Sequence, residues 1–332
     1  MRKRGQTLLV VEGNHEKNEL FQLIFHSFPE LSICMDDVWI YGTNIYMLYD
    51  VIVKEYGESW CEDDIDLPLL ISTQKNEPKR YKDDFTNIFL VFDYERHDPN
   101  FSEQKINRLQ TYFTDATDSG KLYINYPMIE SYQHLNALPD PEYLELKIPV
   151  SVKPGKKYKA LVRDSFLDIA VSYPVKVHDL LADRFHVAEE KLGSIVEKVL
   201  RLDQEDDLLG KIERLLTDAV EQQNIGTAIY QIRALVWKMG YVKNGSNYWK
   251  YMRSLFQQVI LINIDKAYRI QYGRDAYDNC ILNCREKYND LGEQSILEMQ
   301  NEESRDEEDG YIWVLNTCIM LIAEYNFRLL TE

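Results

Sequence analysis

The first 145 residues alternate short apolar runs with segments whose apolar residues recur every three to four positions. The segments 15–28, 44–56 and 102–113 have the spacing of one helical face. The apolar runs between them have the composition of buried strands, and they are Thr7–Val11, Val38–Tyr41, Ile88–Phe92 and Leu122–Tyr126. Strand and helix in alternation predict an α/β domain with a mostly parallel sheet covered by helices.

Two parts of the chain depart from this alternation. Residues 57–84 hold acidic runs and two prolines, so we expect an insertion there, with a short strand over Leu69–Ser72. From about residue 150 the spacing is mostly helical, over 158–171, 176–202, 208–222, 225–239, 246–269, 274–299 and 311–329. The expected organisation is therefore an α/β domain over residues 1–148, followed by a mostly α-helical domain over residues 149–332.

Composition narrows the function classes. The net charge of −17 excludes a protein that binds nucleic acid over its whole surface, but not a local basic groove or a site where metal ions supply positive charge. The chain has no run of about 20 apolar residues, so we expect no membrane span. Its five cysteines have no regular spacing, and Cys280 and Cys284 lack a second pair for zinc, so we expect reduced thiols in a cytoplasmic protein.

Carboxylates follow the predicted strands. Glu12 comes directly after the first strand, Asp93 and Glu95 follow the third, and Glu130 follows the fourth; Glu16 lies one helical turn after Glu12. The carboxyl ends of parallel strands meet at one edge of a sheet, where clustered carboxylates repel each other. A hard divalent cation relieves this repulsion, and two such ions can clamp a phosphodiester. Each acid taken alone can also be a helix cap or a loop residue.

The residues that carry these acids resemble the TOPRIM domain, a Rossmann-like fold. In Leu8–Glu16 an acid ends the first strand in a Glu-Gly context, and the spacing Glu12-Gly-x-x-Glu16 is similar to that of the OLD-like nucleases. Phe89–Glu95 is similar to the strand that ends in Asp-x-Asp. The segments 41–46 and 126–132 look like those of smaller TOPRIM proteins encoded beside an ATPase in phage abortive-infection loci, of the AbiL type.

The resemblance implies a nuclease that depends on Mg²⁺ or Mn²⁺. In this reading Glu12, Asp93 and Glu95 are catalytic and bind metal, while Glu16 and Glu130 support a second ion. The substrate is DNA or RNA, tRNA included, and the role is that of an anti-phage effector paired with an ATPase. The chain itself has no Walker-type nucleotide-binding loop, so any ATPase is a partner subunit.

Several residues are candidates for supporting roles. Glu95 occupies the place of the second acid of Asp-x-Asp, and His97 or Asp98 are alternatives for this ligand role. His15 and His97 can also position a phosphate or shuttle a proton. A basic segment without acids can bind a nucleic-acid backbone or be a solvated linker, and it contains Lys153, Lys156, Lys157, Lys159 and Arg163.

A different class of function stays open beside the nuclease. Glu95 stands where the TOPRIM motif has its second Asp, and the chain is strongly acidic. Both features also fit a non-catalytic sensor or adaptor that has the TOPRIM shape and binds a partner or nucleic acid. Apolar faces such as that of Ile312–Leu330 are candidates for a partner interface or for a homo-oligomer.

Overall fold

A five-stranded sheet forms the centre of the N-terminal region in the computed structural model, which describes residues 6–153, 155–203, 208–217, 219–239 and 247–331. The strand order is β2-β1-β3-β5-β4. Strands β1, β2, β3 and β5 run parallel, and only the two-residue β4 is antiparallel. The strands are β1 (Thr7–Val11), β2 (Val38–Ile40), β3 (Asn87–Asp93), β4 (Thr114–Asp115) and β5 (Gly120–Asn125). The prediction of a mostly parallel sheet is confirmed.

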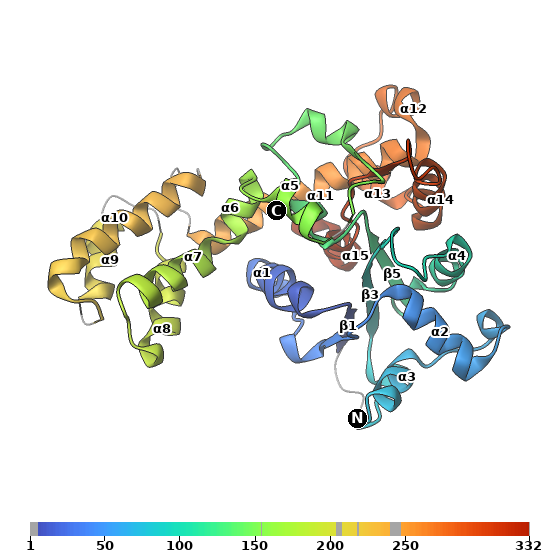
Figure 1. Ribbon diagram of the computed structural model, residues 1–332, viewed down its shortest axis with the longest axis horizontal. Coiled ribbons are helices and arrows are strands. Elements are labelled where there is room, and N and C mark those ends of the chain that lie inside the picture. Colours follow the sequence, from blue (N-terminus) through green and yellow to red (C-terminus); the bar gives the residue numbers. More distant parts are fainter. Residues whose placement is uncertain (1–5, 154, 204–207, 218, 240–246, 332) are drawn as a thin grey trace. The chain divides into compact units, whose positions relative to one another are not determined.

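Helices cover both faces of this sheet. Helix α1 (Gln22–Ser27), which follows a π-helical turn over Glu16–Phe21, lies on one face, while α2 (Ile45–Tyr56) and α4 (Glu103–Tyr112) lie on the other (Figure 1). The chain steps from β1 outward to β2 and then back past β1 to β3, so the strand order reverses between β1 and β3. Such a reversal is where sheets of this kind open a crevice at the carboxyl ends of their strands.

Several predicted elements differ from the structure. The segment Leu69–Ser72 lies in helix α3 (Leu67–Gln74), not in a strand, because Asp66 caps the helix by accepting from the Leu69 N–H. The predicted helix over 274–299 is three helices, α12 (Arg274–Asp278), α13 (Cys284–Asn289) and α14 (Glu293–Glu303). The predicted helix over 311–329 starts instead as strand β7 (Tyr311–Trp313), and only α15 (Leu321–Asn326) is α-helical.

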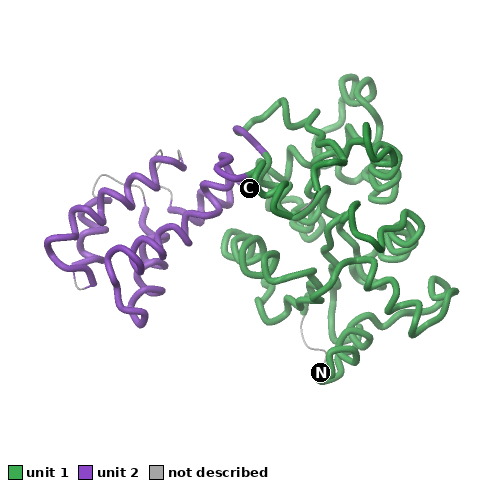
Figure 2. Tube along the Cα trace, viewed as in Figure 1, with its two compact units in different colours: residues 1–134, 138–162, 257–332 green, residues 135–137, 163–256 purple. Residues whose placement is uncertain are grey.

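The division of the chain also differs from the expected boundary after residue 148. One compact unit holds residues 1–134, 138–162 and 257–332, and the other holds 135–137 and 163–256 (Figure 2). The first unit includes the last part of the chain because β7 pairs antiparallel with β6 (Lys147–Pro149) and Tyr126 forms an isolated bridge with Leu315. The second, helical unit is thus an insertion in the chain of the first.

The helical unit contains α6 (Phe166–Val171), α7 (Tyr173–Asp179), α8 (Glu189–Leu200), α9 (Leu208–Leu216), α10 (Gln222–Met239) and the start of α11 (Tyr248–Tyr272); α5 (Lys156–Val162) precedes it. A π-helical turn over Leu180–Arg184 separates α7 from α8, which the sequence predicted as one helix. None of the helices that the structure describes is long and apolar enough to cross a membrane.

Candidate functional site

Two acids lie at the strand reversal. Val11 pairs with Val91, which brings Glu12 and Asp93, the residues that end or follow β1 and β3, to the same edge of the sheet. The backbone N–H of Asp93 donates to Oε2 of Glu12 over 3.4 Å. Asp93 is only 5% exposed. The central pair of predicted site residues therefore lies together at the carboxyl edge of the sheet.

The carboxylates around this pair repel one another. Burial first, and then the charge of Glu95, raises the pKa of Glu12 to about 8, with further contributions from Glu16 and Asp98. Burial and the charge of Glu12 also raise the pKa of Asp93 well above its usual range. Among the described residues no cation compensates either group directly, so the cluster has an excess of negative charge when it is ionised.

Glu16 reaches the site from the π-helical turn that follows β1. Its buried side chain accepts a hydrogen bond of 2.8 Å from the N–H of Gly13. A Cβ atom at Gly13 would lie 3.2 Å from the same carboxylate oxygen, so the glycine leaves space for the bend. The Glu-Gly-x-x-Glu spacing thus returns the second acid to the end of the strand.

Glu95 has a left-handed backbone conformation, with φ of 46°. Such a conformation is unfavourable for a residue with a Cβ atom. Burial and the charge of Asp98 raise the pKa of Glu95. Asp98 in turn accepts a 2.7 Å hydrogen bond from the side chain of Asn44, which caps helix α2. The loop after β3 therefore lies against the first turn of α2, with both of its acids near Glu12.

Glu130 is surrounded by cations instead. Its Oε1 lies 2.8 Å from Nε2 of His15 and 2.6 Å from Nζ of Lys159. Burial opposes ionisation, but His15 and Lys159 lower the pKa of Glu130. Burial likewise opposes the charge of His15, while hydrogen bonds with Glu130 and Glu19 raise its pKa to about 9. Glu130 and His15 therefore form an ion pair beside the acidic cluster.

Two buried polar atoms near the strand ends have no hydrogen-bond partner in the described part of the chain. One is Oε2 of Glu130, whose side chain is 3% exposed, and the other is the Nδ2 group of Asn125. Asn125 ends β5 and pairs in register with Asp93. Unpaired buried polar groups are unfavourable unless a ligand, an ion or water satisfies them, so both atoms are available to a bound group.

The segment 315–320, far from the site in sequence, packs beside these strand ends and was not predicted to take part. The side chain of Thr317 donates to the carbonyl of Ile124, and the N–H of Cys318 donates to Oδ1 of Asn125. Asn316 donates from Nδ2 to the carbonyl of Ile129, next to Glu130. The sequence signal for this segment was only a run of apolar residues, which fits a helix equally well.

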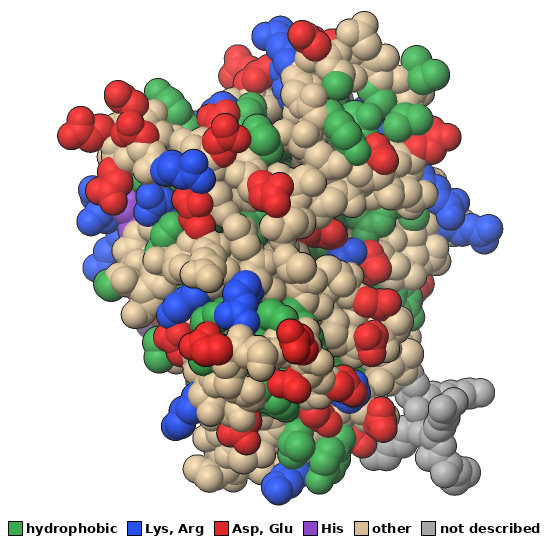
Figure 3. All heavy atoms as spheres, turned by 90° about the vertical axis from the view of Figure 1, so that its right-hand side faces the viewer, with side chains coloured by type: hydrophobic (Ala, Val, Ile, Leu, Met, Phe, Trp, Pro, Cys, Tyr) green, Lys and Arg blue, Asp and Glu red, His purple; other side chains and the backbone are tan. Residues whose placement is uncertain are grey.

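Other predicted residues lie apart from the cluster. Burial, together with the charge of Lys153, lowers the pKa of His97. The basic segment forms α5 and the turns around it, where most of its cations are exposed: Lys153, Lys156, Lys157 and Arg163. Of this segment only Lys159 contacts a site acid. Elsewhere, acidic side chains are spread over the face shown in Figure 3, with basic side chains among them.

Glu12, Asp93 and Glu95 fit a hard divalent cation in kind, since they are carboxylates with raised pKa values and, among the described residues, no ion-pair partner. As the side chains stand, however, no three His, Cys, Asp or Glu residues of the described chain are placed to hold a metal ion. Glu12, Asp93 and Glu95 would have to turn toward a common point for such an ion to bind.

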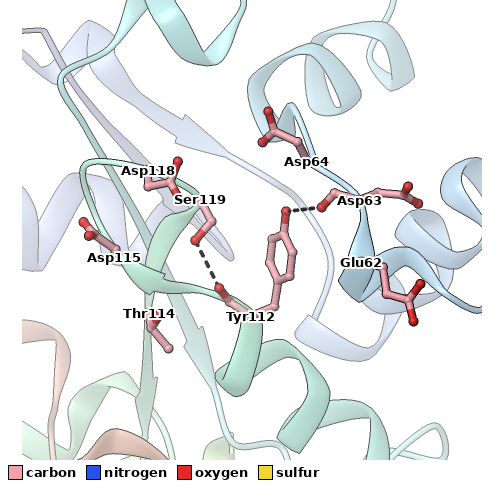
Figure 4. A pocket seen from close by; sticks show the side chains of 8 residues that line it. All are labelled: Glu62, Asp63, Asp64, Tyr112, Thr114, Asp115, Asp118 and Ser119. Atoms are coloured by element: carbon pink, nitrogen blue, oxygen red, sulfur yellow. Dashed lines mark hydrogen bonds between the residues drawn. The ribbon is translucent and has the colours of Figure 1, made fainter.

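A second acidic region lies at the opposite edge of the sheet, near the start of β5. It is a cavity of about 430 Å³, and Figure 4 shows its lining residues: Glu62, Asp63, Asp64, Tyr112, Thr114, Asp115, Asp118 and Ser119. The Tyr112 hydroxyl donates to the carbonyl of Asp63, and Lys82 pairs with Asp64.

Comparisons with family models, with curated proteins and with solved structures found no match to this chain. The geometry of the carboxylate site and the sequence motifs are therefore the features of this chain that bear on its function.

Proposed function

We propose that the protein is a divalent-metal-dependent nuclease of the TOPRIM type, with its active site at the reversal between β1 and β3. The observation that carries the proposal is the group of buried, mutually repelling carboxylates at the ends of adjacent parallel strands. Such a group is destabilising unless a cation or protons compensate it. Active sites tend to have groups of this kind with perturbed pKa values.

In this proposal Glu12, Asp93 and Glu95 hold Mg²⁺ or Mn²⁺, with Glu16 as a further ligand. When bound, the cation supplies charge neutralisation at the phosphate and a more acidic water. Glu12 has a pKa near neutrality in the absence of metal, so its carboxyl group can also accept or release a proton at working pH.

Lys159 and His15 are the cations next to the acids, and they have a different role in this proposal. Their charges hold Glu130 ionised and in place, so Glu130 orients the two cations rather than serving first as a metal ligand. Lys159 is 42% exposed in its side chain and can face a substrate phosphate from this position.

The test is cleavage of plasmid DNA, single-stranded DNA and total tRNA with Mg²⁺ or Mn²⁺, comparing the natural chain with Glu12→Ala and Asp93→Ala. We expect metal-dependent cleavage that both substitutions reduce by at least about 100-fold, because each removes a group needed in the transition state.

The matched control is Asp118→Ala, which removes an exposed acid from the cavity at the opposite edge of the sheet. We expect this variant to cleave normally. Cleavage that survives Asp93→Ala, or that Asp118→Ala abolishes equally, would contradict the assignment of the site.

The biological setting is a proposal from sequence resemblance. The similarity to TOPRIM proteins of abortive-infection loci supports an anti-phage effector that works with an ATPase subunit. Co-expression with an ATPase, if one is encoded beside this chain, followed by the same cleavage assay, tests this setting.

A non-catalytic adaptor is the second candidate. The observation that favours it is that no preassembled set of three metal-binding side chains occurs in the described residues. The two candidates differ in one measurement: calorimetric titration with Mg²⁺ and Mn²⁺ gives saturable binding that Asp93→Ala removes if the protein is a nuclease, and no such binding if it is an adaptor.

A further inference from the structure

A long part of the chain without acids begins in the helical unit and ends just beyond it. From residue 222 to residue 264 there is no Asp or Glu, although 55 of the 332 residues are acidic. The same stretch has five basic residues, Arg233, Lys238, Lys243, Lys250 and Arg253, of which Lys243 lies outside the described residues. This local positive charge contrasts with the net charge of −17 and favours a negatively charged partner.

Helix α10, the first element of this stretch, has two distinct faces. One face packs against α6, α7 and α9 through buried residues that include Ile225, Ile232 and Val236 (Figure 1). The opposite face carries Tyr230 and Trp237, which are seven positions apart and therefore lie on one side of the helix. These two rings are 72% and 61% exposed, more than any other aromatic side chain of the described residues.

The two rings have cationic groups beside them. Arg233 lies between them in sequence, and its guanidinium carbon is 5.2 Å from the centre of the Trp237 ring. In the part of the chain that the structure describes, no carboxylate forms an ion pair with Arg233 or Lys238. One turn before Tyr230, a Cβ atom at Gly226 would meet nothing within 4 Å, so this side of the helix is open.

We propose that this face of α10, formed by Gly226, Tyr230, Arg233, Trp237 and Lys238, binds single-stranded nucleic acid without strong sequence preference. Bases stack on aromatic rings regardless of sequence, and Arg and Lys contact the phosphates. The rise of the helix separates Tyr230 from Trp237 by about 10 Å, which corresponds to about three stacked bases at about 3.4 Å each. The base faces of a duplex are not exposed along its length, so a duplex can bind this face only through contacts between its phosphates and the Arg and Lys side chains.

A protein is the competing occupant, because Trp, Tyr and Arg are also common at the centres of protein interfaces. The absence of Asp and Glu from residue 222 to residue 264 favours nucleic acid, which is a polyanion, over a protein partner. As an account of substrate choice the inference rests on the proposed nuclease function, but binding itself is measured without cleavage.

The test uses the full chain in EDTA, which prevents metal-dependent cleavage. Fluorescence anisotropy measures binding of labelled oligonucleotides of about 20 nucleotides, namely single-stranded DNA, single-stranded RNA and a DNA duplex. We expect the single strands to bind more tightly than the duplex, and Tyr230→Ala and Trp237→Ala each to weaken binding by about 5- to 100-fold. Trp237→Phe, which keeps an aromatic face, should retain most of the affinity.

Tyr325→Ala is the matched control, because it removes an exposed tyrosine that follows Glu324 in the other unit. Equal binding by the natural chain and Tyr230→Ala/Trp237→Ala overturns the inference, and so does an equal loss in Tyr325→Ala. A fall in oligomeric mass in the double variant, with binding unchanged, assigns the face to a protein contact and also overturns it. Binding lost in the α10 variants without any cleavage in Mg²⁺ supports the inference while refuting the nuclease.

Discussion

Replacing Glu12 with glutamine should stabilise the metal-free protein at alkaline pH. Burial and neighbouring acids raise the pKa of Glu12 from 4.5 to about 8. Between these two values the folded state retains a proton that the unfolded chain has lost, so stability falls as pH rises through this window. The glutamine has a similar shape and no charge, so this part of the pH dependence disappears.

The structure sets the size of the effect. A tenfold difference in proton affinity corresponds to about 1.4 kcal/mol, so the shift of the Glu12 pKa to about 8 limits the gain to about 4 kcal/mol at pH 8. We expect about 2 kcal/mol, because the side chain is partly exposed and the cluster can relax toward water. At pH 5 both proteins carry an uncharged group at this position, and the difference should be small.

Urea unfolding followed by circular dichroism, in EDTA at pH 5 and at pH 8, measures this difference. Mg²⁺ should then stabilise the natural chain at pH 8 more than Glu12→Gln, because binding to the folded state adds to its stability. A glutamine variant that is no more stable than the natural chain at pH 8 would refute the argument that uncompensated repulsion exists at this site.

Three further residues around the carboxylate site, Glu95, Asn316 and His15, give additional predictions. Glu95→Gly should raise stability by about 0.5–1 kcal/mol, because glycine adopts the left-handed conformation freely, while cleavage is lost; urea unfolding and the nuclease assay measure the two effects. Asn316→Ala should lower stability by about 1–3 kcal/mol, because it leaves the carbonyl of Ile129 and the N–H of Ile319 without their partner; thermal unfolding measures the loss. His15→Gln should remove the stability that the natural chain has below about pH 6.5 and loses as pH rises through about 9, which unfolding at a series of pH values detects.

Each of these predictions has an outcome that contradicts it. A Glu95→Gly variant that unfolds more easily than the natural chain would show that the Glu95 side chain stabilises its loop. An Asn316→Ala variant of unchanged stability would mean that water replaces its hydrogen bonds. For His15→Gln, a pH profile parallel to that of the natural chain would show that the ion pair with Glu130 does not contribute to folding.

The parts of the fold that follow from local pattern were predictable. Strands β1 and β3 are continuous apolar runs, and both are buried. Parallel pairing then places the residue after each strand at a common edge, which is why Glu12 and Asp93 could be expected as neighbours. The four proposed metal ligands were chosen in this way, because three of them follow strand ends and the fourth lies one helical turn after Glu12. They are Glu12, Asp93, Glu95 and Glu16.

The rest depends on contacts between distant segments. Tyr311–Trp313 is only three residues long, and its partner strand Lys147–Pro149 lies far away in the chain, so no local pattern distinguishes it from the start of an apolar helix. Likewise, Glu130 meets His15 and Lys159 only through the tertiary fold. The left-handed backbone of Glu95 has no signature in its sequence, because left-handed positions usually carry glycine or asparagine.

The segment 315–320 has a consequence for when the site can form during synthesis. Its hydrogen bonds to Ile124 and Asn125 support the strand ends beside Asp93, yet the ribosome makes it only after the whole helical insertion of residues 163–256. Strands β1, β2, β3 and β5 are therefore synthesised long before the segment that supports their carboxyl edge. A chain interrupted before residue 315 lacks this support, so fragments released early from translation should not form the carboxylate site.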